Sequence, residues 1–335
     1  MIAVSTGTPI SITGLGCHAP ERVVTNDDLA KIVDTSDEWI RTRTGIRERR
    51  YAADDEALSD VAFPAAQLAL ERAGVKAVEL DLLIVATVTS DMIFPSTAAM
   101  LADRLGATEA AAYDLSAGCT GFMYGIAQAA GMLGAGLSRR ALVIGADVLS
   151  KLMNFGDRST CVLFGDGAGP AVLEPVATEG FLGFELGADG ARGLDLQMPA
   201  GGSRLPASAE TVAGGLHTVQ MNGREVFKFA TRVLVSSAES LLEKTGVAIE
   251  DVDVYVPHQA NVRIIDHAVE KLGIPEERVV VNVDRYGNTS SASIPLALAE
   301  AVDDGRVQEG SMILMTGMGA GLTWGSALMR WTEAV

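Results

Sequence analysis

Short apolar segments that favour β-strands alternate with amphipathic segments that favour helices along this chain of 335 residues. This alternation predicts an α/β core with parallel strands, because each crossover between parallel strands needs a connection such as a helix. We expect strands at residues 10–16, 81–87, 141–145, 252–256, 279–283, 311–316 and 322–329, and a hairpin over residues 160–174. We expect helices at residues 35–42, 58–74, 122–133, 223–246, 260–272 and 290–301.

A weak internal repeat runs through this pattern. A strand, then Cys119 at the start of a helix, is followed by a strand that ends at Gly145. The same order recurs around Asn288, with a strand that ends at Gly317. We therefore expect two similar halves, residues 1–179 and 180–335. Residues 187–215, rich in Gly, Ala, Ser and Pro, are expected to form excursions over a site.

Composition excludes several classes of protein. The net charge of −17 argues against a nucleic-acid partner. No apolar run reaches the roughly 18 residues of a membrane helix, so we expect no membrane partner. Residues 1–9 lack a basic region and an extended apolar region, so we expect no secretory signal. The three cysteines match neither a disulfide framework nor a zinc site, which fits the reducing cytoplasm.

Cys119 is the strongest candidate for chemistry. It lies in the small-residue turn Gly118-Cys119-Thr120-Gly121, between an apolar strand and a helical segment. Unpaired N–H groups at a helix N-terminus favour the thiolate, so we expect a lowered pKa and a nucleophile. Cys17 and Cys161 lie within or beside strand patterns, and we expect both to be small buried hydrophobes.

Two polar residues follow other expected strands. His258 comes directly after Pro257, and Asn288 comes after Gly287. One thiol, one imidazole and one amide, all at strand ends, indicate covalent acyl transfer. Taken alone, His258 fits a structural histidine and Asn288 fits ordinary turn chemistry. The apparent repeat and the presence of Cys119 favour catalytic roles for both.

The glycine-rich segment GMGAG at residues 317–321 invites comparison with a nucleotide-binding loop. A dinucleotide fingerprint needs a helix after the glycines, whereas another strand is expected here. A glycine turn between strands can instead bring backbone N–H groups close to a reacting carbonyl, although a plain β-turn is the simpler interpretation.

Several segments together resemble the β-ketoacyl-acyl-carrier-protein synthase III family. They are DTSDEWI (34–40), RTGI (43–46), FGDGAG (164–169), VPHQAN (256–261), GNTS (287–290) and LTWG (322–325). The resemblance runs from about Ile10 to the C-terminus. It implies the thiolase-like fold, in which duplicated α/β halves form five layers (αβαβα), and a homodimer.

The resemblance also implies a reaction. Cys119, His258 and Asn288 would form the family's Cys-His-Asn triad. A short acyl-CoA, such as acetyl-CoA, would acylate Cys119. Malonyl-acyl-carrier protein would then condense with the acyl group and lose carbon dioxide, which starts fatty acid synthesis. Acyl-CoA is a substrate here, and the family needs no cofactor or metal.

Further site residues are implied by the resemblance alone. Trp39 would stack on the CoA adenine, with Arg43 and Arg158 nearby. Asn261 and Gly223 would line the pantetheine tunnel. The remaining substrate-binding positions would be Leu149, Met318, Gly319 and Ala320, together with Phe94, which would reach across the dimer interface to close the acyl pocket.

Docking of the carrier protein is expected at Lys228 and Arg263, a local basic patch on an acidic enzyme. Two residues depart from the family pattern. Met318 stands where many relatives carry an aromatic residue, and Glu270 stands where a basic residue often supports docking. Both leave primer choice and docking strength open.

Three other functions are compatible with parts of this pattern. A type III polyketide synthase-like or starter-unit enzyme shares the triad, but the segment around Trp39 and Arg43 favours the carrier-protein enzyme. A papain-like protease has the same residue order and a similar Cys119 to His258 spacing, but its Cys-Gly-Ser-Cys-Trp-like signature is missing. A non-catalytic acyl-binding protein would form no acyl-cysteine adduct.

Overall fold

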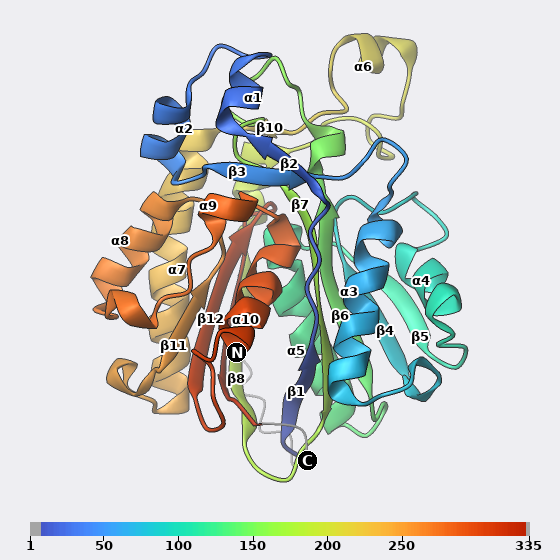
Figure 1. Cartoon of the computed structure of the whole chain (residues 1–335), viewed down its shortest axis with the longest axis vertical. Coiled ribbons are helices and arrows are strands. Elements are labelled where there is room, and N and C mark those ends of the chain that lie inside the picture. Colours follow the sequence, from blue (N-terminus) through green and yellow to red (C-terminus); the bar gives the residue numbers. More distant parts are fainter. Residues whose placement is uncertain (1–7, 333–335) are drawn as a thin grey trace.

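Two large β-sheets lie side by side in the computed structural model of this chain (Figure 1). The first sheet has the order β1 (Ile10–Leu15), β7 (Asp166–Pro175), β6 (Ala141–Val148), β4 (Leu82–Ala86) and β5 (Ala111–Leu115). The second has the order β8 (Gly180–Ala188), β13 (Thr323–Arg330), β12 (Met312–Gly319) and β11 (Val254–Pro257). Strand β4 is parallel to β5 and β6, β11 is parallel to β12, and the other neighbours are antiparallel.

The second sheet repeats the first in strand order and direction, as the internal repeat predicts. Strands β8, β13, β12 and β11 stand where β1, β7, β6 and β4 stand in the first sheet. At the position of β5, the second half has only a parallel bridge between Tyr255 and Val279. The strand expected at residues 279–283 is therefore wrong, since a short helix, α9 (Val283–Tyr286), follows almost at once.

Helices cover both sheets and fill the space between them. Helices α3 (Leu58–Ala73) and α4 (Thr97–Leu105) pack on the first sheet, and α7 (Gly223–Thr245), with α8 (Val262–Leu272) beside it, packs on the second. Helices α5 (Gly121–Gly134) and α10 (Ser293–Asp303) lie between the sheets (Figure 1). The result is five layers, αβαβα, with Phe122 and Ile294 buried in the central core.

Smaller elements lie over one end of the two sheets (Figure 1). They are α1 (Asn26–Ala30), α2 (Asp37–Thr44), β2 (Arg22–Thr25) and β3 (Glu48–Tyr51), with the β9 (Leu196–Gln197) and β10 (Gln220–Met221) pair nearby. Helix α6 (Ala209–Ala213) projects beside them. Two 3-10 turns, η2 (Gly118–Thr120) and η7 (Ser290–Ala292), precede the central helices α5 and α10.

The hairpin expected over residues 160–174 is also wrong. Only its second arm is a strand, β7, and residues 158–163 form turns. The chain before β7 pairs with the other half of the protein instead: Asn288 N donates to Leu163 O at 2.8 Å, and Gly165 N donates to Asn288 O at 3.0 Å. A Cβ on Gly165 would lie 2.2 Å from Tyr286 O, so only glycine allows this approach.

The structure describes residues 8–332. Residues 1–7, which make up most of the segment expected to lack a secretory signal, lie outside the described part. Among the described helices, none is both long and apolar enough to cross a membrane.

Gly145 offers a test of the packing between the halves. A Cβ at this position of β6 would lie 2.2 Å from Ser291 O. We expect Gly145→Ala to lower the free energy of unfolding by about 1–3 kcal/mol through overpacking, measured by urea denaturation. Gly131→Ala in α5 is the control, because no atom lies within 4 Å of its new Cβ. The control should be as stable as the parent or slightly more stable, and equal stability of both variants would contradict this account.

Candidate active site

Cys119 lies where the two halves of the protein meet. It follows β5, in the 3-10 turn η2 that leads into α5. The loop after β12 packs directly on this turn: a Cβ on Gly319 would lie 2.5 Å from Cys119 N, and one on Gly118 would lie 2.7 Å from Ala320 N. Gly118 also has a φ of 58°, in the left-handed region. Glycine at both positions therefore allows the two backbones to approach.

His258 follows β11 and is fully buried. Its Nδ1 lies 2.5 Å from the Ser293 hydroxyl oxygen, at the start of α10. Its Nε2 has no hydrogen-bond partner among residues 8–332. His258 also lines a cavity together with Cys119, so the unpartnered nitrogen belongs to a residue at the cavity wall.

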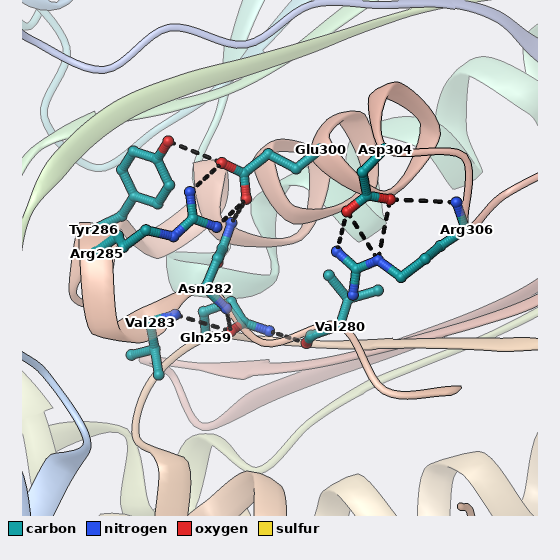
Figure 2. A network of polar contacts seen from close by, with 9 residues as sticks. All are labelled: Gln259, Val280, Asn282, Val283, Arg285, Tyr286, Glu300, Asp304 and Arg306. Carbon is teal, nitrogen blue, oxygen red and sulfur yellow. Dashed lines mark hydrogen bonds and ion pairs between the residues drawn. The ribbon is translucent and has the colours of Figure 1, made fainter. Parts of the chain in front are cut away.

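A polar network joins the segment of His258 to the segment that leads to Asn288 (Figure 2). Gln259 Nε2 donates to Val280 O at 2.9 Å, and Gln259 Oε1 accepts from Asn282 N at 2.9 Å. Glu300 of α10 then accepts hydrogen bonds from Asn282 Nδ2, Tyr286 OH and both terminal nitrogens of Arg285, at 2.8–2.9 Å. Gln259 and Asn282 are buried, and satisfied hydrogen bonds between buried groups hold a backbone in one arrangement.

Asn288 has a fixed side-chain orientation. Its Oδ1 accepts a hydrogen bond from Ser290 N at 2.9 Å. Its Nδ2 makes no hydrogen bond within the described part of the chain, and the residue lines the same cavity as His258. The amide therefore presents a donor to this cavity.

Two cavities meet at Cys119. The first, of about 100 Å³, is lined by Cys119, His258, Asn288, Gly223, Phe227, Asn261, Met318 and Gly319, among others. The second, of about 150 Å³, is mainly apolar and is lined by Cys119, Val88, Leu149, Leu152, Phe164, Leu196, Met198, Val219, Ser290 and Ala320, among others. Of the three residues of the expected triad, only Cys119 borders both cavities. A molecule that reaches the sulfur through the first cavity could leave an acyl chain in the second.

The expected lowering of the Cys119 pKa is wrong. Burial raises the pKa of the thiol to about 11, although hydrogen bonds from the Ser290 hydroxyl and a backbone N–H act in the opposite direction. Burial also lowers the pKa of His258 to about 3. Both side chains are therefore neutral near pH 7, because the low-dielectric interior disfavours either charge more than the turn geometry stabilises it.

Trp39 and the two arginines expected near it lie together. The guanidinium carbons of Arg43 and Arg158 lie 4.6 Å and 5.0 Å from the centroid of the Trp39 ring. Trp39 is half-buried, so its ring is not simply part of the core. Asn261 Nδ2 donates to Arg43 O at 3.1 Å, and this bond connects the cluster to the first cavity.

The other expected residues lie further out. Phe94 is 82% exposed and is not among the described residues that line either cavity. Lys228 on α7 forms an ion pair with Glu225 at 2.8 Å. Arg263 on α8 lies 5.7 Å from the ring of Phe227, which lines the first cavity. Glu270 is exposed near the end of α8.

Sequence reasoning missed three serines near the residues of the expected triad. Ser290 has a φ of 53°, unusual for a residue other than glycine, and hydrogen-bonds the Cys119 sulfur. Ser291 Oγ donates toward Asp147 Oδ2 at 2.8 Å, and Ser293 contacts His258. The available signal was the run of Ser and Thr directly after Asn288.

Comparison with known proteins decides the family. Residues 113–190 match the family model "3-Oxoacyl-[acyl-carrier-protein (ACP)] synthase III", and residues 242–331 match the model of its C-terminal part. The chain is 59% identical over 324 residues to β-ketoacyl-acyl-carrier-protein synthase III of Symbiobacterium thermophilum, covering 96% of this chain and 98% of that protein. The chain belongs to the β-ketoacyl-acyl-carrier-protein synthase III family. It is therefore an acyltransferase.

Solved structures of synthase III proteins agree with this assignment. The structure from Thermus thermophilus is 50% identical and has a TM-score of 0.90, covering 97% of this chain and 100% of that one. A priming β-ketosynthase from the R1128 polyketide pathway is 37% identical, with a TM-score of 0.90 and 98% of each chain covered. The expected thiolase-like fold, with its duplicated α/β halves in five layers, is confirmed.

The raised pKa of Cys119 in this synthase III makes its reactivity strongly dependent on pH. Because only the thiolate reacts, the alkylation rate should rise about tenfold per pH unit between pH 7 and 9, still below the pKa of about 11. Iodoacetamide labelling followed by intact-mass spectrometry measures this rate. Cys119→Ala provides the background from Cys17 and Cys161. A plateau below pH 8 would show that the thiol pKa is low.

Proposed function

We propose that this synthase III condenses a short acyl-CoA with malonyl-acyl-carrier protein, through an acyl-Cys119 intermediate, to give 3-oxoacyl-acyl-carrier protein. One observation carries the proposal. Cys119 borders both the apolar second cavity and the first cavity, which His258 and Asn288 also line and where His258 Nε2 and Asn288 Nδ2 have no hydrogen-bond partner among the described residues. The apolar second cavity suits the acyl group, and the first cavity suits a thioester that must be polarised.

In the first half-reaction, the Cys119 sulfur attacks the thioester carbonyl of acyl-CoA. A tetrahedral oxyanion forms, and backbone N–H groups at Cys119 and in the loop of residues 319–321 donate hydrogen bonds to it. The bond from carbon to the CoA sulfur then breaks. The thiol proton of Cys119 ends on the CoA thiolate, so this exchange neither releases nor consumes a proton.

In the second half-reaction, the malonyl carboxylate leaves as carbon dioxide, and its bonding electrons form an enolate. His258 Nε2 and Asn288 Nδ2 donate hydrogen bonds to the enolate oxygen. The nucleophilic carbon attacks the acyl-Cys119 carbonyl, a carbon–carbon bond forms, and Cys119 leaves as a thiolate that takes up one proton. Each such donor is typically worth about 3–4 kcal/mol of transition-state stabilisation.

The CoA substrate would enter past Trp39. The adenine would stack on the Trp39 ring, with Arg43 and Arg158 beside it to stack or to bind phosphate. The pantetheine arm would pass Asn261 and Gly223 to reach Cys119. Leu149 and Ala320 would contact the acyl group in the apolar cavity.

A homodimer would complete the acyl pocket. Strand β5 is at the edge of the first sheet, where a second copy can pair with it. Phe94, which is 82% exposed in the single chain, would then reach into the acyl pocket of its partner.

We also propose that residues 1–179 and 180–335 form the two halves, since β7 ends at Pro175 and β8 begins at Gly180.

The carrier protein would dock beside the mouth of the first cavity, where Lys228 and Arg263 supply positive charge to an acidic partner. The enzyme acts in the cytoplasm in this proposal, without a cofactor, since acyl-CoA is itself a substrate. Met318 lines the first cavity, where its flexible thioether would shape the tunnel. The exposed Glu270 on α8 would weaken docking.

A starter-unit synthase of specialised metabolism is the alternative that shares this chemistry. The 59% identity to a synthase III, against 37% to the polyketide priming enzyme, favours the fatty acid enzyme. Comparing malonyl-acyl-carrier protein with malonyl-CoA as the extender separates a carrier-protein enzyme from a type III polyketide synthase. The sequence also leaves the length of the primer open. One methylene group changes the free energy by which a pocket distinguishes two primers by only about 1–3 kcal/mol.

Acylation of Cys119 is the first test of this function. Incubation with acetyl-CoA should add one acetyl group to the protein, seen by intact-mass spectrometry and absent in Cys119→Ala. A panel of acyl-CoA primers in the same assay then ranks primer choice. If the parent protein gains no mass while it still binds CoA, a non-catalytic acyl-binding protein is indicated.

His258 should matter more for condensation than for acylation. We expect His258→Ala to reduce the condensation rate by roughly 10²–10³-fold, the effect of losing one donor to a developing oxyanion. Acylation by acetyl-CoA should fall much less, because Cys119 and backbone groups carry that step. Rapid-quench measurement of the two half-reactions compares them, and an equal loss in both would contradict this division of roles.

A further inference from the structure

Ser293 contacts the catalytic histidine from inside the protein. It is the first residue of α10 and is 2% exposed. Its hydroxyl oxygen lies 2.5 Å from His258 Nδ1 and accepts a hydrogen bond from Gln259 N at 3.3 Å. The hydroxyl therefore bridges the imidazole and the next peptide along the chain.

The Gln259 peptide is held in place, so its N–H keeps this direction. The Gln259 side chain is 1% exposed, and Nε2 donates to Pro257 O at 2.8 Å and to Val280 O at 2.9 Å. Its Oε1 accepts from the backbone N–H groups of Asn282 and Val283 (Figure 2). A backbone N–H can only donate, so the Ser293 oxygen is the acceptor in this contact.

Counting protons then fixes the tautomer of His258. The Ser293 hydroxyl carries one proton, and in the described structure its only available acceptor is His258 Nδ1. If Nδ1 carried a proton, it and the hydroxyl would both be donors across 2.5 Å, or the hydroxyl proton would be left buried without a partner. Donation from Ser293 to Nδ1 satisfies every group.

The remaining nitrogen of the ring then carries the proton. Burial keeps the pKa of His258 low, at about 3, so the ring holds a single proton near pH 7. That proton is on Nε2, which has no partner within the described residues. Nε2 is therefore a buried, unpartnered donor beside a cavity that Asn288 and Cys119 also line.

We propose that Ser293 is a positioning residue that holds His258 in the Nε2–H tautomer, so that His258 donates a hydrogen bond to the thioester oxygen during condensation and does not act as the base for Cys119. The catalytic part of this inference rests on the proposed function, whereas the tautomer itself does not. Cys119 would then lose its proton without help from this imidazole.

Nitrogen NMR of the intact protein tests the tautomer directly. With ¹⁵N-labelled histidine, and with His258→Ala to assign the signals, we expect an unprotonated Nδ1 and a protonated Nε2 at pH 7–8. In Ser293→Ala, both nitrogens should shift toward the averaged values of mixed tautomers. A protonated Nδ1 in the parent protein would overturn the inference whether or not the enzyme condenses malonyl-acyl-carrier protein.

Kinetics test the consequence for catalysis. We expect Ser293→Ala to reduce the kcat of condensation by about tenfold or more, with a change below about threefold in KM for malonyl-acyl-carrier protein and in the acylation rate. Ser293→Thr, which keeps the hydroxyl, should restore both the NMR signature and the rate if it folds. Ser237→Ala is the matched control, because it removes another buried hydroxyl, which accepts from Ser326 Oγ at 2.8 Å in the contact between α7 and β13.

The outcomes separate this inference from the proposed function. If Ser293→Ala keeps the parent tautomer, or condenses at the parent rate, Ser293 is not a positioning residue, although synthase activity can still stand. If the parent protein is not acylated or does not condense malonyl-acyl-carrier protein, the proposed function fails, and the NMR result still decides the tautomer. A loss in Ser293→Ala that Ser237→Ala reproduces would indicate a general effect on stability.

Discussion

The contact between the turn before α10 and the first half of the protein holds this site together. Asp147 of β6 is fully buried, and its Oδ1 accepts hydrogen bonds from Thr87 Oγ1, Val88 N and Thr89 Oγ1, all in the first half. Its Oδ2 accepts from the N–H and the hydroxyl of Ser291, in the second half. A buried carboxylate is tolerated only when donors surround it, so it holds the two halves in one arrangement. Cys119 meets His258 and Asn288 because of this contact.

The same burial sets the electrostatics of the site. It raises the pKa of the Cys119 thiol and lowers that of the His258 imidazole, so neither is charged near pH 7. Charge then appears mainly during reaction, on the tetrahedral oxyanion and on the enolate. In a low-dielectric cavity, fixed donors stabilise such charge more strongly than they would in water. The structure therefore favours stabilisation of intermediates over a preformed thiolate.

Much of this protein could be predicted from its sequence, for physical reasons. Cys119 follows a strand of the first sheet and His258 follows a strand of the second, so a shared sheet could not bring them together. The internal repeat predicted two similar halves, and polar residues at facing strand ends of two such halves, Asn288 included, can share one site. The hairpin predicted over residues 160–174 was wrong because residues 163–165 pair with Asn288, which is far away in sequence. The prediction of a lowered pKa for the Cys119 thiol was wrong because burial raises this pKa, and burial depends on how distant parts of the chain pack together. Ser293 was missed because its partner, His258, lies on another element.

A crystal structure of the Cys119→Ala protein with a non-decarboxylating malonyl-thioester analogue tests the central claim most directly. This account predicts that the thioester oxygen lies within hydrogen-bond distance, about 3.2 Å or less, of both His258 Nε2 and Asn288 Nδ2. The reacting carbon should then face the position of the missing sulfur. A thioester oxygen turned away from both nitrogens, with the imidazole facing the position of the missing sulfur instead, would contradict it.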